Sequence, residues 1–228
     1  MPEWEILDDA RPIVGRRYGT QRARMLAFDL ADGGLCVVSP GTGIGDDALA
    51  ELEGWGRPRF LLAPNHFHNA GIKPWTERYR DVIVVAHERA IPRLRRQVPG
   101  ADIEDLTRLF AALKPGDRLL SPPVAKQGET WVSLGTSAGR MWFVCDGIVN
   151  ETRLPAGPLG MMMRVLGYRE ELMANPVFRR LFISDRQGYA DWVAEQVAAD
   201  PPDVFVPAHG AVLRGADVGE RLRAACVA

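Results

Sequence analysis

The stretch LLAPNHFHN, Leu61–Asn69, decides how this chain is interpreted. Its apolar start is typical of a buried strand. Two histidines, His66 and His68, follow two residues apart near its end. Where the backbone bends after a strand, both imidazoles can turn toward one ion, and imidazole suits zinc and iron. The alternative is a pair of loop histidines that form ordinary hydrogen bonds. The stretch therefore predicts a strand end and makes a metal site the question to pursue.

Two further apolar runs end in residues of the same kind. The run MWFVCDG, Met141–Gly147, places Asp146 directly after a strand, and VFVPAHG, Val204–Gly210, places His209 after another. An ionised carboxylate at a strand end needs a partner, and a cation is a suitable one. As a turn residue, Asp146 would instead accept hydrogen bonds from nearby backbone amides. The four residues together favour a metal site built from strand-end loops.

Strands and helices alternate along the chain. Turn residues over 31–34 predict a hairpin between a strand near 22–28 and another over 35–39. After it we expect a helix from Asp46, strands over 60–63 and 82–86, a helix over 88–97, strands over 131–134 and 141–145, a mostly helical stretch over 155–199 and a last strand over 204–206. This order predicts a layered α/β fold of two similar halves, and no composition break divides residues 1–228, so we expect a single domain.

One segment of the predicted helical stretch has two interpretations. Met161, Met162 and Met163 follow one another in the irregular region over 155–167. They belong either to a helix that packs onto the core or to an adaptable wall of a substrate pocket, because methionine fills irregular gaps.

Composition limits the class of protein. With 228 residues, 46% of them hydrophobic, the chain can fill a proper core. Its 28 basic and 29 acidic residues leave a net charge of −1, so no broad field attracts nucleic acid or an anionic membrane. No basic leader with an apolar stretch, no spanning apolar run and no C-x-x-C pair occurs. We expect a cytoplasmic protein that acts on a small-molecule substrate, and the sequence leaves its oligomeric state open.

The order of these features resembles the metallo-β-lactamase superfamily from about residue 20 to 215. An early strand and glycine turn over Val37–Gly45, a helix, the strand end with His66 and His68, a strand pair ending in Asp146 and a final Pro-Ala-His-Gly over 207–210 follow that family's order. The resemblance implies a four-layer αββα sandwich with the metal site at one edge. It also implies zinc or iron, usually two ions, that activate water for hydrolysis.

The chain departs from the family pattern at several ligand positions. In the family's H-x-H-x-D-H motif, Ala70 and Gly71 stand where the aspartate and the third histidine would be. The central histidine would fall in the turn Gly135–Gly139, which contains none, and Ser39-Pro40 replaces the aspartate of the early glycine turn. The resemblance is therefore to a degenerate branch, and it implies a site for one ion.

On this basis the expected metal ligands are His66, His68, Asp146 and His209, around one zinc or iron ion, or around none if the missing ligands abolish binding. Asp146 and His209 are the expected catalytic residues, with His209 as the base. The leading hypothesis is a metal-dependent hydrolase of unknown substrate. The alternatives are a catalytically inactive protein of the same fold that binds a small molecule or a protein partner, and redox chemistry at iron as in flavodiiron-like relatives.

Overall fold

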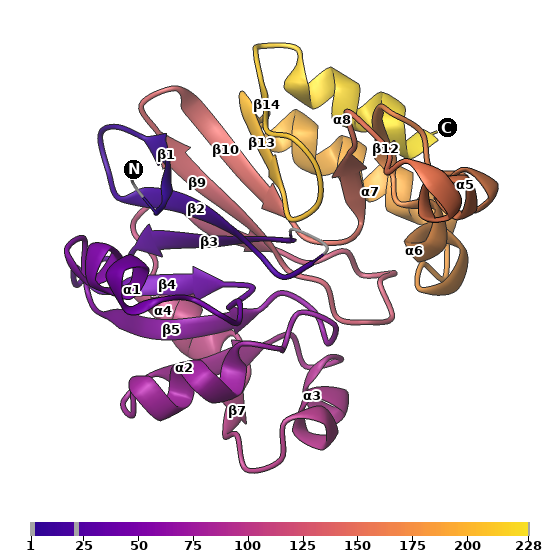
Figure 1. The fold of residues 1–228 in the computed structure, drawn as a ribbon. Coiled ribbons are helices and arrows are strands. Elements are labelled where there is room, and N and C mark those ends of the chain that lie inside the picture. The colour runs from indigo at the N-terminus through magenta and orange to yellow at the C-terminus, as the bar shows by residue number, and fades with distance from the viewer. Residues whose placement is uncertain (1–2, 21–22, 228) are drawn as a thin grey trace.

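Two β-sheets lie face to face in the computed structural model, and helices cover the outer face of each (Figure 1). The structure describes residues 3–20 and 23–227. The arrangement is the four-layer αββα sandwich that the sequence predicts. Within the described ranges, no helix combines the length and the apolar character needed to cross a membrane.

The first sheet comes from the first half of the chain and has seven strands in sequential order. Strands β1 to β4 pair antiparallel, whereas β4 to β7 pair parallel. The strands are β1 (Glu5–Asp8), β2 (Ile13–Tyr18), β3 (Ala23–Asp29), β4 (Leu35–Val38), β5 (Pro58–Ala63), β6 (Ile83–Ala86) and β7 (Ile103–Glu104). The parallel strands β4 and β5 have every residue but Arg59 buried, which is why they are continuous apolar runs in the sequence.

The second sheet comes from the second half and has the strand order β14-β13-β10-β9-β8. Only β10 and β13 pair parallel, and the other neighbours are antiparallel. Its strands are β8 (Arg118–Leu120), β9 (Trp131–Thr136), β10 (Gly139–Val144), β13 (Val204–Pro207) and β14 (Leu213–Arg214). A separate antiparallel pair is formed by β11 (Ile148–Asn150) and β12 (Leu172–Ala174).

The described chain has eight helices. They are α1 (Asp46–Glu53), α2 (Ile72–Arg78), α3 (Ile91–Gln97), α4 (Thr107–Ala112), α5 (Gly157–Val165), α6 (Pro176–Leu181), α7 (Arg186–Ala199) and α8 (Val218–Val227). Helices α1, α2 and α3 cover the first sheet through Leu52, Trp75 and Leu94. Helices α7 and α8 cover the second sheet.

The central core lies between the two sheets. Side chains from the first sheet, such as Leu26 and Leu62, share one cluster with Phe143 and Val206 of the second. All four are fully buried, and burying such a side chain contributes about 1.5–3 kcal/mol each. This shared interior fixes the two sheets relative to each other, and therefore fixes the edge at which their strands end together.

Most expected elements are confirmed. The hairpin over β3 and β4, the helix from Asp46 and the strand that precedes His66 all form where the sequence predicts them. The stretch over 155–199 is mostly helical, as expected, with the short strand β12 between α5 and α6. Met161 and Met162 are 67% and 53% exposed, so these two do not pack into the core, and they lie outside the cavity described below.

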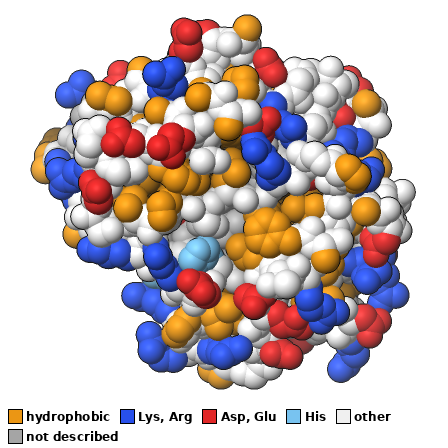
Figure 2. Space-filling model, turned by 180° about the vertical axis from the view of Figure 1, so that it is seen from behind, with side chains coloured by type: hydrophobic (Ala, Val, Ile, Leu, Met, Phe, Trp, Pro, Cys, Tyr) orange, Lys and Arg blue, Asp and Glu red, His pale blue; other side chains and the backbone are white. Residues whose placement is uncertain are grey.

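The surface carries mixed charges. On the face seen in Figure 2, basic and acidic side chains are interspersed with small hydrophobic patches. No broad field of one sign covers this face, as the net charge of −1 predicts.

Candidate metal centre

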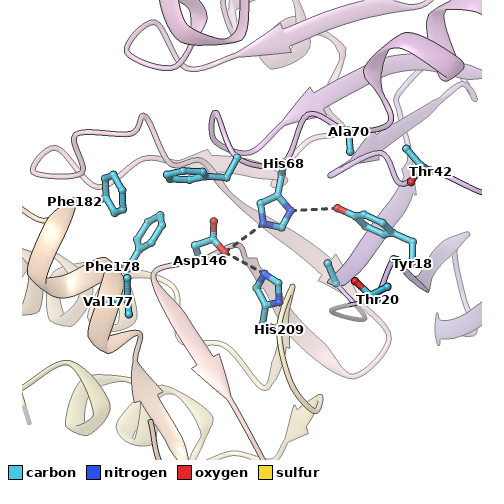
Figure 3. A pocket seen from close by; sticks show the side chains of 13 residues that line it. Tyr18, Thr20, Thr42, His68, Ala70, Asp146, Val177, Phe178, Phe182 and His209 are labelled. Carbon is cyan, nitrogen blue, oxygen red and sulfur yellow. Dashed lines mark hydrogen bonds and ion pairs between the residues drawn. The ribbon is translucent and has the colours of Figure 1, made fainter. Parts of the chain in front are cut away.

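Three of the four predicted ligands converge at one edge of the sandwich. His68 follows β5, Asp146 follows β10 and His209 follows β13. Since β10 and β13 are parallel, their carboxyl ends meet at the same edge. Figure 3 shows Asp146 between the two imidazoles. One ligand atom from each of the three residues lies within 4.8 Å of the other two.

The distances between these atoms suit a tetrahedral ion. Asp146 Oδ1 lies 3.3 Å from His68 Nε2 and 3.2 Å from His209 Nε2. Ligands that bind zinc at about 2.0–2.1 Å in tetrahedral geometry are about 3.3–3.4 Å from one another. Nitrogen and carboxylate oxygen are also the donors that zinc and non-haem iron accept. The three residues are therefore a candidate ligand group for a single metal ion.

Asp146 is buried and held in its ionised form. Burial alone would raise its pKa, but the adjacent His68 and His209 hold the pKa of Asp146 well below its usual range. Asn65 Nδ2 donates to the other carboxylate oxygen, Oδ2, at 2.7 Å. Asn65 Oδ1 in turn accepts from the backbone N–H of Phe67 at 2.8 Å, so the loop after β5 fixes the amide. Asp146 thus presents Oδ1 to the two histidines at every ordinary pH.

His68 is oriented by contacts to Nδ1, the ring nitrogen that does not face Asp146. Its Nδ1 lies 2.6 Å from Ser39 Oγ, and Ser39 Oγ lies 2.8 Å from the Tyr18 hydroxyl. Opposite the ionised Asp146, Nε2 of His68 donates a hydrogen bond. If an ion replaced that proton, a proton on Nδ1 donated to Ser39 would leave the lone pair of Nε2 for the ion, which is how the far nitrogen of a metal-binding histidine is usually held. Ser39 has a positive φ of 55°, the one such value among the non-glycine residues that the structure describes. Strain of this kind is typical of functional sites.

His209 is placed by the glycine that follows it. Gly210 has a φ of +99°, and a Cβ at this position would lie 2.0 Å from the Asn150 carbonyl oxygen. The backbone carbonyl of His209 accepts from the Asn150 N–H at 3.3 Å. Only glycine allows this close approach, so Pro-Ala-His-Gly forms a turn that directs the imidazole at the site.

His66 is not part of the group of three. Its ring centroid lies 4.2 Å from that of Phe67 and 6.3 Å from that of Phe182. Burial, with a contribution from Arg93, lowers the pKa of His66, and its Nε2 is buried without a hydrogen-bond partner. The ring is therefore neutral and holds a free polar atom, and its role as a fourth ligand stays a prediction. Asn69 Nδ2 donates to the His66 carbonyl and so shapes this loop.

The two positions after the histidine pair differ. Ala70 lines the cavity over the site (Figure 3). At Gly71, a Cβ would lie 2.2 Å from the carbonyl oxygen of Pro40 and 2.6 Å from that of Gly41. Both obstacles are backbone atoms, so no larger side chain fits there unless the loop moves.

One expectation about the central histidine position is corrected. The turn Gly135–Gly139 joins β9 to β10 at the end of the hairpin away from Asp146. With about 3.4 Å per residue, the six residues of β10 separate the turn from the site by about 20 Å. The residues that precede β9 lie at the site instead. There Glu129 accepts from the Gly147 N–H at 2.9 Å, next to Asp146.

Sequence reasoning overlooked Glu129. It is fully buried, and burial together with the charge of Asp146 raises the pKa of Glu129 to about 7. The available signal was a single charged residue between Gly128 and the apolar strand that starts at Trp131.

A cavity of about 530 Å³ opens over the three ligands. One wall is aromatic, formed by Phe67, Phe178 and Phe182, whose ring centroids lie 5.0–6.1 Å apart. The opposite wall carries the hydroxyl groups of Tyr18, Thr20 and Thr42 (Figure 3). A cavity of this size suits a small molecule with one apolar end.

Comparison with known proteins gives a clear result for the fold. Neither a protein-family model nor a curated protein sequence matches the chain. A metallo-β-lactamase from Erythrobacter litoralis, solved with β-mercaptoethanol in its active site, aligns with a TM-score of 0.60 at 14% identity, over 98% of this chain and 95% of that one. The DIM-1 metallo-β-lactamase, exposed to ceftazidime, aligns with a TM-score of 0.58 at 13% identity, over 99% and 97%.

A flavo-diiron protein from Thermotoga maritima also aligns. Its TM-score is 0.57 at 15% identity, over 98% of this chain and 60% of that one. At such identities the likeness shows the metallo-β-lactamase fold and nothing finer.

Proposed function

We propose that this protein is a metal-dependent hydrolase in which His68, Asp146 and His209 hold one zinc or iron ion. The observation that carries the proposal is the convergence of three ligand atoms from three strand ends within 4.8 Å. Both imidazole Nε2 atoms lie at a tetrahedral edge length from Asp146 Oδ1. The likeness to metallo-β-lactamase structures supports hydrolysis as the reaction class.

A bound ion would supply Lewis acidity and activate water for attack. The residues of the chain supply the negative charge and the orientation of the proposed ligands. Asp146 contributes a negative charge that is present at every ordinary pH, because its pKa is held low. Ser39 keeps His68 in the orientation in which Nε2 faces the centre. The site therefore needs little rearrangement when an ion enters.

Proton transfer falls to Asp146 or His209. Among the described residues that line the cavity, the other ionisable groups are His68, whose Nε2 faces the centre, and Tyr18, and burial raises the pKa of Tyr18 to about 12. That phenol stays protonated and serves as a hydrogen-bond partner of Ser39. His209 has a side chain that is 21% exposed, against 7% for His68, so it has the better access to water. An Nε2 atom that holds the ion has no lone pair left for a proton, so we propose that His209 accepts a proton only in a state in which it has left the ion.

The cavity favours a small substrate with an apolar group. Phe67 is 41% exposed and stands beside Phe178 and Phe182, so these rings can cover an apolar moiety and exclude water from the reacting bond. The hydroxyl groups on the other wall are suited to the polar end of the molecule.

Metal analysis tests the binding step. Protein purified without chelator should contain about one ion per chain, and added zinc or iron should raise the melting temperature of chelator-treated protein, because a ligand bound only by the native state stabilises it. His68→Ala should lose the ion. His87→Ala is the matched control, because His87 lies outside the group of three. His66→Ala decides whether that histidine adds a fourth ligand.

An activity screen tests the chemistry. The metal-loaded protein should hydrolyse one class among esters, amides, thioesters and phosphoesters with apolar substituents, and His68→Ala should not. Full metal retention in His68→Ala would refute the site. Metal binding without hydrolysis of any substrate class would instead support the non-catalytic alternative, and oxygen consumption by an iron-loaded protein would support redox chemistry.

A further inference from the structure

A second cavity, of about 430 Å³, lies on the other side of α6 from the metal centre. Val177 and Phe178 of this helix line the metal cavity, whereas Arg179 and Arg180 line the second one. The rest of its lining comes from the loop before β12, from the start of α7 and from α8. The function proposed above makes no use of this cavity.

The second cavity is strongly basic. Arg169, Arg179, Arg180 and Arg186 line it, against one carboxylate, that of Glu171. A net charge of −1 for the whole chain makes this local excess of cations unusual. Apolar atoms of Met173 and Ala225 form other parts of the wall and reduce the access of water to the charges.

These guanidinium groups lack the partners that other arginines of the chain have. In the part of the chain that the structure describes, the side chains of Arg169, Arg179 and Arg186 form no hydrogen bond or ion pair, and the side chain of Arg180 donates to the carbonyl of Leu166 at 3.1 Å. By contrast, Arg11 pairs with two aspartates.

Four cations around one small cavity repel one another, and Arg179 is half-buried, whereas Arg169, Arg180 and Arg186 are exposed and retain more of their hydration. Desolvating an unpaired charge is unfavourable, so a ligand that neutralises these groups stabilises the arrangement. Guanidinium groups present a planar fork of donors that matches the oxygens of phosphate. The volume is within the range of small-molecule sites, about 300–1,000 Å³.

We propose that this cavity binds a phosphate-bearing anion with two or more negative charges. The phosphate belongs either to a free metabolite or to a lipid headgroup. Exposed apolar side chains of α5 lie next to the cavity along the chain, including Leu159, Met161 and Val165. They provide apolar surface for acyl chains if the source is a lipid.

Calorimetric titration with inorganic pyrophosphate tests whether the cavity binds the phosphate of a free compound. Chelator-treated protein is used, so that pyrophosphate cannot bind through a metal ion at the other site. We expect saturable binding that weakens with salt, since exposed charges are screened. The double variant Arg179→Gln/Arg180→Gln should weaken it by about tenfold or more, because hydrogen bonds between charged groups are lost.

The matched control is Arg80→Gln/Arg96→Gln, which removes the same charge from two exposed arginines outside the cavity. It should bind as the natural protein does. Arg186→Gln, at an exposed position, serves as a second cavity variant if the double variant does not fold. Circular dichroism establishes that each variant is folded.

Vesicle co-flotation tests whether the cavity binds the phosphate of a lipid headgroup. Phosphatidylcholine vesicles with and without phosphatidic acid are compared. A lipid headgroup is identified if two results occur together. Flotation must require phosphatidic acid and be lost in the cavity variant, and pyrophosphate must bind weakly. Saturable pyrophosphate binding that the cavity variant loses identifies a free phosphate compound. Absence of both, or equal losses in the cavity and control variants, would overturn the proposal. Because the protein is metal-free, the outcome does not depend on the hydrolase assignment.

Discussion

Glu129 is a fully buried carboxylate beside the candidate metal centre, and Glu129→Gln measures what its charge costs the fold. Burial, with the charge of Asp146, raises the pKa of Glu129 from 4.5 to about 7. Each pH unit between the two values corresponds to about 1.4 kcal/mol. Ionised Glu129 therefore destabilises the metal-free protein by about 3 kcal/mol, and we expect the variant to gain that amount at pH 8.

The direction of the pH dependence follows from the pH values at which the Glu129 carboxyl ionises in the folded and in the unfolded protein. Below pH 4.5 the carboxyl is protonated in both the folded and the unfolded protein, so it adds no pH-dependent penalty. Between pH 4.5 and about 7 the unfolded chain has released the proton and the folded chain retains it, so the stability falls as the pH rises. Above about pH 7 the full cost is present. The gain from Glu129→Gln should thus be small near pH 5 and largest at pH 8.

The hydrogen bonds around Glu129 make glutamine a close replacement. Oε1 accepts from the Gly147 N–H at 2.9 Å and from Trp131 Nε1 at 2.8 Å, and a glutamine oxygen can keep both. Oε2 accepts from Gln127 Nε2 at 3.1 Å. The new amide nitrogen can donate to Gln127 Oε1, which lacks a partner, once the Gln127 amide rotates.

Urea unfolding followed by circular dichroism, in chelator at pH 5 and pH 8, is the assay. Glu195→Gln, at an exposed position of α7, is the control and should leave the stability unchanged at both pH values. The reasoning is refuted if Glu129→Gln has the same effect at both pH values, or if it destabilises the protein at pH 8.

Three other substitutions have expected outcomes. Gly147→Ala should destabilise the protein by about 1–3 kcal/mol in the same assay, because its Cβ would lie 2.4 Å from the buried hydroxyl of Tyr189. Ser39→Ala should weaken metal binding by about tenfold in competition with a chelator, because it releases Nδ1 of His68; unchanged affinity would argue against this orienting role. Phe182→Ala should raise KM for an apolar substrate and leave kcat unchanged, and an equal change for a substrate without an apolar group would contradict the assignment of the aromatic wall.

The sequence predicts the fold and the strand ends well because these signals are local. An apolar run followed within a few residues by His66, Asp146 or His209 shows where a strand ends and which side chain it places there. Parallel pairing then brings such ends to one edge, a rule that needs no knowledge of distances. This is why Asp146 and His209 can be placed together from sequence.

The remaining parts of the site depend on register and packing, which a sequence does not display. The contact between Ser39 and His68 joins two loops after different strands, and nothing local to either residue indicates it. The glycines of Gly135–Gly139 suggested the site turn, but the direction of the hairpin places the residues before β9 there. The raised pKa of Glu129 depends on complete burial and on the charge of Asp146, both of which are tertiary properties.

Ala70 and Gly71, the two positions at which the resemblance to the metallo-β-lactamase superfamily would place further ligands, differ in a way that bears on the proposed number of ions. The side chain of Ala70 faces the cavity. A carboxylate is therefore absent there only because the residue is alanine, and not because the backbone leaves no room. At Gly71 the Pro40 carbonyl lies where a Cβ would be and also accepts from the Gly71 N–H at 3.0 Å. A histidine at that position would break this contact and displace the turn that holds Ser39 against His68. The backbone path that orients His68 therefore also leaves no room for a side chain at Gly71, which supports the proposal of a single ion.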